Sequence, residues 1–249
     1  MIMPEGGRAE GRNAVLEAYR SGKTVDKLYV QEHLMDGPIQ TILREAKKTG
    51  TIVSFVTKDR LDAMTTTGHH QGVIAQVTAF SYADVDDMFR LAEERGEPPF
   101  LVLLDEIEDP HNLGAIIRTA CQAGAHGVIV TKHRSAGLTA TVVRASAGAL
   151  YHVPVAKVTN LKKTISDLKK RGVWFVCADM EGVPMYDLDL KGPLGVVIGS
   201  EGRGVSRLVR EACDFTARVP MTGRIDSLNA SVACAVLLYE AVRQRGILR

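Results

Sequence analysis

The chain lacks any apolar run that approaches the length of about 20 residues needed to span a membrane. Its opening residues, MIMPEGGRAEGRNAVLEA, also lack the apolar core of a secretory signal peptide. Together these two absences predict a cytoplasmic protein with no membrane attachment.

Cysteine is scarce and widely spaced. The four cysteines are Cys121, Cys177, Cys213 and Cys234, and each lies in an apolar or alanine-rich segment. This spacing fits neither a CxxC site nor a disulfide framework, so we expect buried, reduced thiols. Because no group of His, Cys or carboxylate residues has metal-ligand spacing, we also expect no bound metal.

A strong excess of either charge is also missing, since the formal net charge is +2. The charge is nevertheless uneven: residues 1–78 carry +1, residues 79–100 carry −4 and residues 101–249 carry +5. The basic C-terminal part is compatible with a polyanionic partner, but an ordinary solvated surface explains it equally well.

The chain does contain two kinds of α/β pattern. Its 249 residues, 45% of them hydrophobic, suit one large or two small domains. Residues 10–79 alternate helical and strand-like pieces, which predicts a compact α/β module, and the acidic residues 80–99 read as a linker able to form one amphipathic helix. From residue 100, six apolar runs alternate with helical patterns, which predicts a parallel sheet covered on both faces. The runs are FLVLLDEI, HGVIVT, YHVPVAKV, VWFVCADM, LGVVIGS and DFTARVPM.

A glycine-rich loop, VVIGSEGRGVS at 196–206, follows the fifth of these runs. Dinucleotide-binding folds place such a loop after the first strand, and a P-loop requires a lysine that is missing here, so both are disfavoured. Glu201 also argues against a phosphate site, because a carboxylate about 4 Å from a phosphate costs roughly 4 kcal/mol at an effective dielectric of about 20. On spacing alone, the glycines could equally form a turn before a helix capped by Ser206.

Three polar clusters stand at predicted strand ends: DPHNLGAIIRTA at 109–120, IGSEGRGVS at 198–206 and VPMTGRIDSLNAS at 219–231. In order and spacing they resemble motifs one to three of the SpoU (TrmH) family of RNA ribose 2′-O-methyltransferases. GRNAVLEA at 11–18 and HHQGVIAQV at 69–77 resemble its RlmB branch, which modifies a guanosine of 23S ribosomal RNA. The resemblance covers nearly the whole chain.

The resemblance implies a domain organisation that spacing could not reveal. It implies an L30e-like α/β RNA-binding domain at 1–79, a linker at 80–99 and a SPOUT-type trefoil-knotted parallel α/β methyltransferase domain at 100–249. It further implies S-adenosylmethionine as cofactor, RNA as partner and a homodimer. A tRNA ribose methyltransferase of the same family, or a noncatalytic RNA-binding relative, are the alternatives.

The resemblance also implies the site residues. A pocket for S-adenosylmethionine is expected from Ile198, Gly199, Val219, Met221 and Leu228. The reacting groups are expected beside Asn112, Arg118, Glu201, Ser227 and Asn229. Arg118 is implied to be catalytic, and because a guanidinium keeps its proton, we expect it to hold the target phosphate and the 2′-oxygen in line with the methyl group.

The residues alone allow plainer interpretations. Arg118 lies off the apolar stripe of its helix and could be a surface arginine. Asn112 could cap that helix, and Ser227 or Asp226 the last one. Glu201 could be a surface carboxylate, although its motif position suggests that it orients Arg118 or bonds the substrate ribose. With no Asp or Cys partner at a telling spacing, His69, His70 and His111 are expected to be loop residues or RNA contacts.

Overall fold

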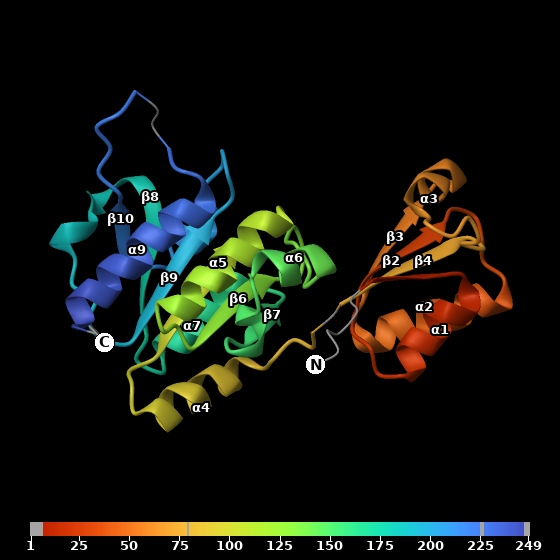
Figure 1. Ribbon diagram of the computed structural model, residues 1–249, viewed down its shortest axis with the longest axis horizontal. Helices are drawn as coiled ribbons and strands as arrows, with labels where there is room; N and C mark the ends of the chain where they lie inside the picture. Colours follow the sequence, from red (N-terminus) through yellow and green to blue (C-terminus); the bar gives the residue numbers. More distant parts are fainter. Residues whose placement is uncertain (1–6, 79, 225–226, 247–249) are drawn as a thin grey trace. The chain divides into compact units, whose positions relative to one another are not determined.

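The computed structural model describes residues 7–78, 80–224 and 227–246, and it divides into two units, each with its own sheet (Figure 1). The first unit comprises Met1–Ser81 with the short segment Gly137–Ala140. The second comprises Tyr82–Ala136 and Thr141–Arg249.

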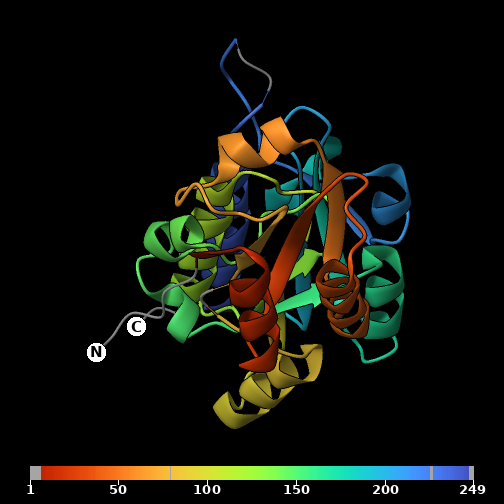
Figure 2. The ribbon, with the colours of Figure 1, turned by 90° about the vertical axis from the view of Figure 1, so that its right-hand side faces the viewer.

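The first unit is a four-stranded mixed sheet with two helices packed on one face. The strand order is β1-β4-β2-β3, in which β2 and β3 are parallel and β4 runs antiparallel to β1 and β2. Val15 of α1 and Ile39 and Ile42 of α2 are buried against the sheet, and Figure 2 shows the two helices on this face. The elements are β1 Gly7–Glu10, α1 Arg12–Arg20, β2 Val25–Gln31, α2 Gly37–Thr49, β3 Ile52–Val56, α3 Lys58–Met64 and β4 Val73–Val77.

Helix α2 shows how the sequence sets the ends of an element. Asp36 accepts a hydrogen bond from the backbone N–H of Ile39, and Pro38 occupies the first turn, where its missing N–H costs nothing. Gly50 ends the helix with φ of 65°, a left-handed conformation that glycine adopts without strain.

The second unit is a six-stranded sheet, and all of its strands are parallel. Their order is β10-β8-β9-β5-β6-β7, so the first strand in the chain, β5, lies inside the sheet beside β9. The strands are β5 Phe100–Asp105, β6 Gly127–Thr131, β7 Val155–Val158, β8 Trp174–Pro184, β9 Leu194–Gly199 and β10 Phe215–Arg218. Each coincides with one of the six predicted runs, so the predicted parallel α/β class is confirmed.

Helices cover both faces of this sheet. Met88 of α4, Ile165 of α7 and Val209 of α8 share one buried cluster with the sheet, whereas α5 and α9 pack together over β9 (Figure 1). The helical segments are α4 Val85–Arg95, α5 Pro110–Gln122, α6 Ala140–Ala145, the 3₁₀ turn η1 Ala149–Tyr151, α7 Leu161–Lys169, the 3₁₀ turn η2 Met185–Asp187, α8 Arg207–Arg210 and α9 Ala230–Arg245. Helix α4 lies within the expected linker at 80–99, and its Met88 is fully buried, so this helix is packed as part of the second unit.

The sequence predicts neither a membrane-spanning segment nor a disulfide framework. Among the described residues, no helix combines the length and apolar character needed to cross a membrane. All four cysteines are free thiols: Cys177 and Cys234 are buried, while Cys121 and Cys213 are only half-buried. The Cys177 thiol donates to the Thr216 hydroxyl at 3.6 Å, and the Cys213 thiol donates to the Val209 carbonyl at 3.3 Å.

Candidate active site

The three polar clusters predicted from sequence meet at the carboxyl ends of β5 and β9. Asn112 lies in the first turn of α5, which follows β5, and Glu201 lies in the loop that follows β9. Asn229 directly precedes α9. β5 and β9 are neighbours in parallel register, with Asp105 opposite Gly199, so the segments that leave them start side by side. Ligands of open α/β sheets bind at this edge.

Asn112, Glu201 and Asn229 form a closed ring of hydrogen bonds. The Asn112 Nδ2 amide donates to Glu201 Oε1 at 2.9 Å, and Asn229 Nδ2 donates both to Asn112 Oδ1 at 2.9 Å and to the same Glu201 oxygen. Oε1 of the carboxylate therefore accepts two N–H groups, and its Oε2 has no hydrogen-bond partner among the residues that the structure describes. Such charge-assisted hydrogen bonds are stronger than those between neutral groups.

Asn229 owes its orientation to the helix that it caps. Its Oδ1 accepts from the backbone N–H groups of Ser231, at 2.9 Å, and Val232, at 3.3 Å, at the start of α9. Because the oxygen faces the helix, the NH₂ group must face Glu201. The capping residue is thus Asn229 and not Ser227; the rival cap Asp226 lies outside the described residues.

The glycine loop folds back on the strand that it leaves. Gly202 and Gly204 have φ of 80° and 65°, and the Gly204 N–H donates to the Ser200 carbonyl at 2.8 Å. A Cβ on Gly199 would lie 2.0 Å from the Gly204 carbonyl carbon and 2.1 Å from the Val205 nitrogen. Gly199 is therefore required by a close approach of backbone to backbone, which only a residue without Cβ permits.

Two carboxylates at the end of β5 hold this loop, and both lie outside the three polar clusters. Asp105, only 5% exposed, accepts from the backbone N–H of Ser206 at 2.8 Å. The Ser206 side chain makes no capping bond to α8, contrary to the capping interpretation. Glu106 pairs with Arg203 of the loop at 3.1 Å and has φ of 59°, a strained conformation for a residue with a Cβ. Two acids directly after the apolar run FLVLL are the sequence feature that indicates them.

Arg118 and Ser227 form no hydrogen bond with the ring residues of the same chain in the described ranges. Both are exposed, and neither forms a hydrogen bond or ion pair with another residue in the described ranges. Arg118 follows Asn112 by six residues, so its side chain leaves α5 about 120° from that of Asn112 around the helix axis. Glu201 thus engages the two asparagines and does not contact Arg118.

The five residues expected to bind a cofactor come from two segments of the chain, the end of β9 and the stretch after β10. Ile198 and Gly199 are buried at the end of β9. Val219 is half-buried just after β10, and Met221 and Leu228 expose 40% and 37% of their surface although both are apolar. Exposed apolar side chains suit a ligand with an apolar body, such as the adenosine part of S-adenosylmethionine. They do not suit a phosphate ligand.

The histidines do not join this site. Contrary to the expectation that it lacks an acidic partner, buried His70 bonds Asp62 Oδ1 through Nε2 at 2.8 Å. Its Nδ1 accepts the Gly72 N–H at 3.0 Å, so the proton of the neutral ring sits on Nε2. His69 and His111 are exposed. Within the described part of the chain, no three His, Cys, Asp or Glu residues are grouped to hold a metal ion.

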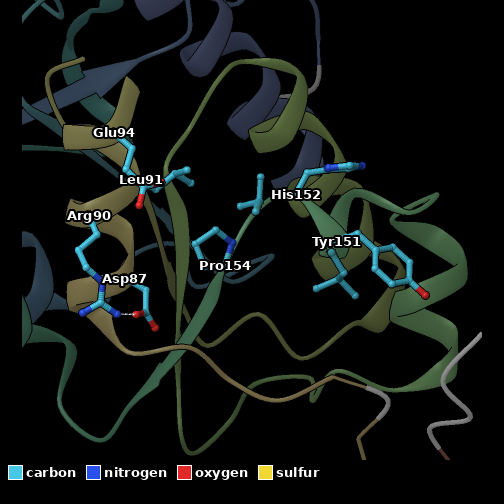
Figure 3. A pocket seen from close by; sticks show the side chains of 9 residues that line it. Asp87, Arg90, Leu91, Glu94, Tyr151, His152 and Pro154 are labelled. Carbon is cyan, nitrogen blue, oxygen red and sulfur yellow. Dashed lines mark hydrogen bonds and ion pairs between the residues drawn. The ribbon is translucent and has the colours of Figure 1, made fainter. Parts of the chain in front are cut away.

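The second unit also contains a separate cavity of about 410 Å³, whose lining side chains are drawn in Figure 3. Asp87, Arg90 and Glu94 of α4 line it from one side and Tyr151 and His152 from the other, and Asp87 pairs with Arg90. The residues after His152 lead directly into β7, so this cavity lies at the amino ends of the strands. Its two carboxylates and single arginine give it no positive excess to attract RNA phosphates.

Comparison with protein families matches both parts of the chain. Residues 99–239 match the model of the SpoU rRNA Methylase family. Residues 8–83 match a model described as RNA 2′-O ribose methyltransferase substrate binding. These two ranges contain the ring and the mixed sheet, respectively.

Individual proteins show the same similarity over nearly the full length. The chain is 49% identical over 236 residues, 94% of each sequence, to YacO of Bacillus subtilis (strain 168), whose name places it among TrmH family tRNA/rRNA methyltransferases. It is similar to the SpoU methyltransferase AviRb from Streptomyces viridochromogenes in complex with AdoMet, with a TM-score of 0.60, 30% identity and coverage of 96% of this chain and 90% of that chain. An AdoMet-bound rRNA methyltransferase from Sinorhizobium meliloti gives a TM-score of 0.59, 26% identity and coverage of 97% and 88%.

Proposed function

The chain belongs to the SpoU rRNA methylase family, and from this premise we propose that it methylates the ribose 2′-hydroxyl of a nucleotide in structured RNA. It is an RNA methyltransferase that uses S-adenosylmethionine as its methyl donor. The observation that carries the proposal is the ring of Asn112, Glu201 and Asn229, because it fixes a carboxylate and two amides at the ligand-binding edge of the sheet.

The proposed division of labour follows from the chemistry of each group. S-adenosylmethionine supplies an electrophilic methyl group on a positive sulfonium. Ile198, Gly199, Val219, Met221 and Leu228 form its pocket, in which the two exposed apolar side chains cover the adenosine. Glu201 lowers the energy of a positive charge nearby and accepts a hydrogen bond from the ribose with its remaining oxygen. Asn112 and Asn229 hold that carboxylate in place, and Ser227 lies beside the reacting groups.

Arg118 binds the phosphate of the target nucleotide and sets the 2′-oxygen in line with the methyl group. A guanidinium remains protonated in proteins, so it cannot take the proton of the 2′-hydroxyl, which leaves instead to phosphate or water. The contribution of Arg118 is therefore orientation, which can supply several kcal/mol of the barrier reduction.

A second copy of the chain completes the site in this proposal. Arg118 is exposed and faces away from the ring of its own chain, so a partner subunit can bring an equivalent arginine to that ring. Helix α9 supports a dimer, because the apolar side chains of Val232 and Tyr239 are 46% and 51% exposed on one side of the helix. We also propose that the second unit carries the trefoil knot that its sequence resemblance implies.

The proposed substrate is RNA, as both the reaction and the first unit indicate. The nucleophile is a hydroxyl that DNA lacks, which restricts the substrate to RNA. Residues 1–79 grip structured RNA as a separate domain, joined through 80–99 to the methyltransferase domain at 100–249. We assign a guanosine of 23S rRNA as the target, which places the enzyme in the cytoplasm. A tRNA ribose is the alternative, because the curated relatives are named for both RNA classes.

Mapping of 2′-O-methyl groups on rRNA and tRNA, from cells with and without the gene, tests the target. A 23S guanosine that loses its mark supports the assignment, and a tRNA position that loses it replaces the assignment by the alternative. Calorimetry with S-adenosylmethionine separates the enzyme from a noncatalytic RNA-binding relative, which would release no heat on mixing.

Substitution of Arg118 tests the mechanism. Arg118→Ala should lower methyl transfer roughly a hundredfold or more, because the substrate loses its alignment, while calorimetry shows an unchanged affinity for S-adenosylmethionine. Arg90→Ala, which removes an exposed arginine on α4, is the matched control and should leave transfer unchanged. Wild-type turnover of the Arg118 variant would disprove the assigned role.

A further inference from the structure

The first unit contains a cavity of about 710 Å³ whose function is not assigned by the family comparison. It lies where the parallel strands β2 and β3 end, between the first turns of α1 and α3 and the loop that precedes β4. Its volume is within the range of known ligand sites. The lining residues are Arg12, Asn13, Gln31, Leu34, Pro38, Lys58, Asp62, Gly68, His70, Gln71 and Gly72.

One wall of the cavity is held rigidly by internal hydrogen bonds. The Gln71 side chain accepts from the backbone N–H of Arg12 at 3.1 Å, and the His70 ring bridges Asp62 and Gly72. Gly72 has φ of 80°, and a Cβ there would lie 2.2 Å from Leu34 Cδ2. This wall is therefore formed before any ligand binds.

Glu10 anchors the loop that leads into this wall. Its carboxylate accepts hydrogen bonds from the backbone N–H groups of Thr66 and Thr67 and from the hydroxyls of Thr65, Thr66 and Thr67. Although burial raises the pKa of Glu10, these hydrogen bonds lower it far below the usual value. The loop is thus fixed at neutral pH.

Other polar groups of the lining have no partner within the described chain. The side chains of Asn13 and Gln31 form no hydrogen bond there, and exposed Lys58 forms no ion pair. Arg12, in contrast, is engaged by Asp36 at 2.6 Å. For a ligand the cavity therefore offers the amides of Asn13 and Gln31, the Lys58 ammonium group and the apolar surfaces of Leu34 and Pro38. The other lining amide, Gln71, and the lining carboxylate, Asp62, are held by Arg12 and His70.

We propose that this cavity binds one unstacked nucleotide of the RNA substrate, an inference that rests on the proposed function. The base lies against Leu34 and Pro38, and the amides of Asn13 and Gln31 pair with its edge, because an amide presents the donor and acceptor that base edges require. Lys58 contacts the phosphate. A site for phosphate alone does not need the amides and would present more than one unengaged cation.

The test uses the full-length protein and an RNA hairpin with one bulged nucleotide, made in four versions that differ in the bulged base. The fully paired hairpin is the reference, and fluorescence anisotropy gives the dissociation constants. Wild type should bind at least one bulged version about fivefold more tightly than the paired hairpin, and Asn13→Ala or Lys58→Ala should remove that preference. Lys23→Ala, at the opposite end of β2, should retain it.

Competition experiments identify the ligand chemistry. A nucleoside monophosphate should displace the bulged hairpin, whereas inorganic phosphate at the same ionic strength should not. Equal displacement by both would overturn the proposal, as would equal affinity of the Asn13→Ala, Lys58→Ala and Lys23→Ala proteins. Thermal unfolding of each variant verifies that it is folded.

This result is independent of the chemistry in the second unit. If wild type prefers the bulged hairpin but transfers no methyl group to cellular RNA, the proposed function fails and the nucleotide site stands. If it methylates RNA while Asn13→Ala and Lys58→Ala bind every hairpin as wild type does, the nucleotide site fails alone.

Discussion

At the scale of single residues, Glu201 contributes both hydrogen-bond acceptance and negative charge, and two different substitutions are needed to distinguish these contributions. The carboxylate accepts hydrogen bonds from Asn112 and Asn229, and it also carries a negative charge. A glutamine keeps an acceptor oxygen in the same place and removes only the charge. An alanine removes both, and it leaves the amide of Asn112, which is 8% exposed, without this acceptor.

We therefore expect Glu201→Gln to lower the rate of methyl transfer roughly tenfold or more, while its thermal unfolding matches that of wild type. Glu201→Ala should lose the rate and also about 1–3 kcal/mol of stability, because a buried amide loses its partner. Single-turnover assays and calorimetric unfolding measure the two effects. A glutamine variant as unstable as the alanine variant would show that the charge stabilises the fold.

The identities of these residues could be predicted from the motifs, but their contacts could not. Asn112, Glu201 and Asn229 are separated by 89 and 28 positions, and no periodicity relates them. From the sequence, Ser227 and Asp226 are as plausible as Asn229 for the N-cap of α9, because the choice depends on the residue at which the helix begins. The partner of His70 was missed for the same reason: Asp62 approaches it only once α3 has folded.

At the scale of elements, the loop at Thr65–Thr67 depends on a single carboxylate from β1. The lowered pKa of Glu10 means that its charged form is more stable in the folded state than in the unfolded state. Its contribution is therefore complete above the ordinary carboxyl pKa of 4.5 and is lost as the pH falls toward the lowered folded-state pKa.

Glu10→Gln should accordingly lower the unfolding temperature of the first unit by about 4 °C or more at neutral pH, and by progressively less below pH 4.5. Circular dichroism follows both units, and the only tryptophan, Trp174, reports the second unit by fluorescence. Glu17→Gln, an exposed change on α1, is the control. A difference between Glu10→Gln and wild type that persists undiminished in acid would contradict this origin.

Strands and helices were predicted well where their pattern is strong. The six apolar runs became the parallel sheet, and Gly246 ends α9 with φ of 66° as its position suggested. β1 was missed, because the four residues GRAE show no apolar alternation and form a strand only by pairing with β4. Helix α4 belongs to the second unit because Met88 is buried in that unit's core. The acidic sequence of this helix gives no sign of that packing.

At the scale of the whole molecule, the exposed side of α9 decides the oligomeric state in our proposal. Val232 and Tyr239 are seven positions apart, two turns of the helix, and therefore lie on one stripe with half-buried Ala235 and Val236. A contiguous apolar stripe of this kind is typical of a surface that another protein covers.

The double substitution Val232→Asp and Tyr239→Glu should convert a dimer into a monomer, because it would bury charges without partners. Sedimentation velocity measures the change, and methyl transfer should fall with the fraction of dimer, since Arg118 would act across the interface. Phe55→Glu, which alters an equally exposed apolar residue of the first unit, should leave the mass unchanged. A double variant that stays dimeric would place the interface elsewhere.

The ring also has a consequence for the order of events during synthesis. The first unit closes its sheet within about 70 residues of chain, between β1 and β4. The ring needs Asn229, which is made 117 residues after Asn112. Contacts between such distant parts form late in folding, and domains fold in turn as they emerge. A growing chain can therefore complete the sheet of its first unit long before it can form the ring of Asn112, Glu201 and Asn229.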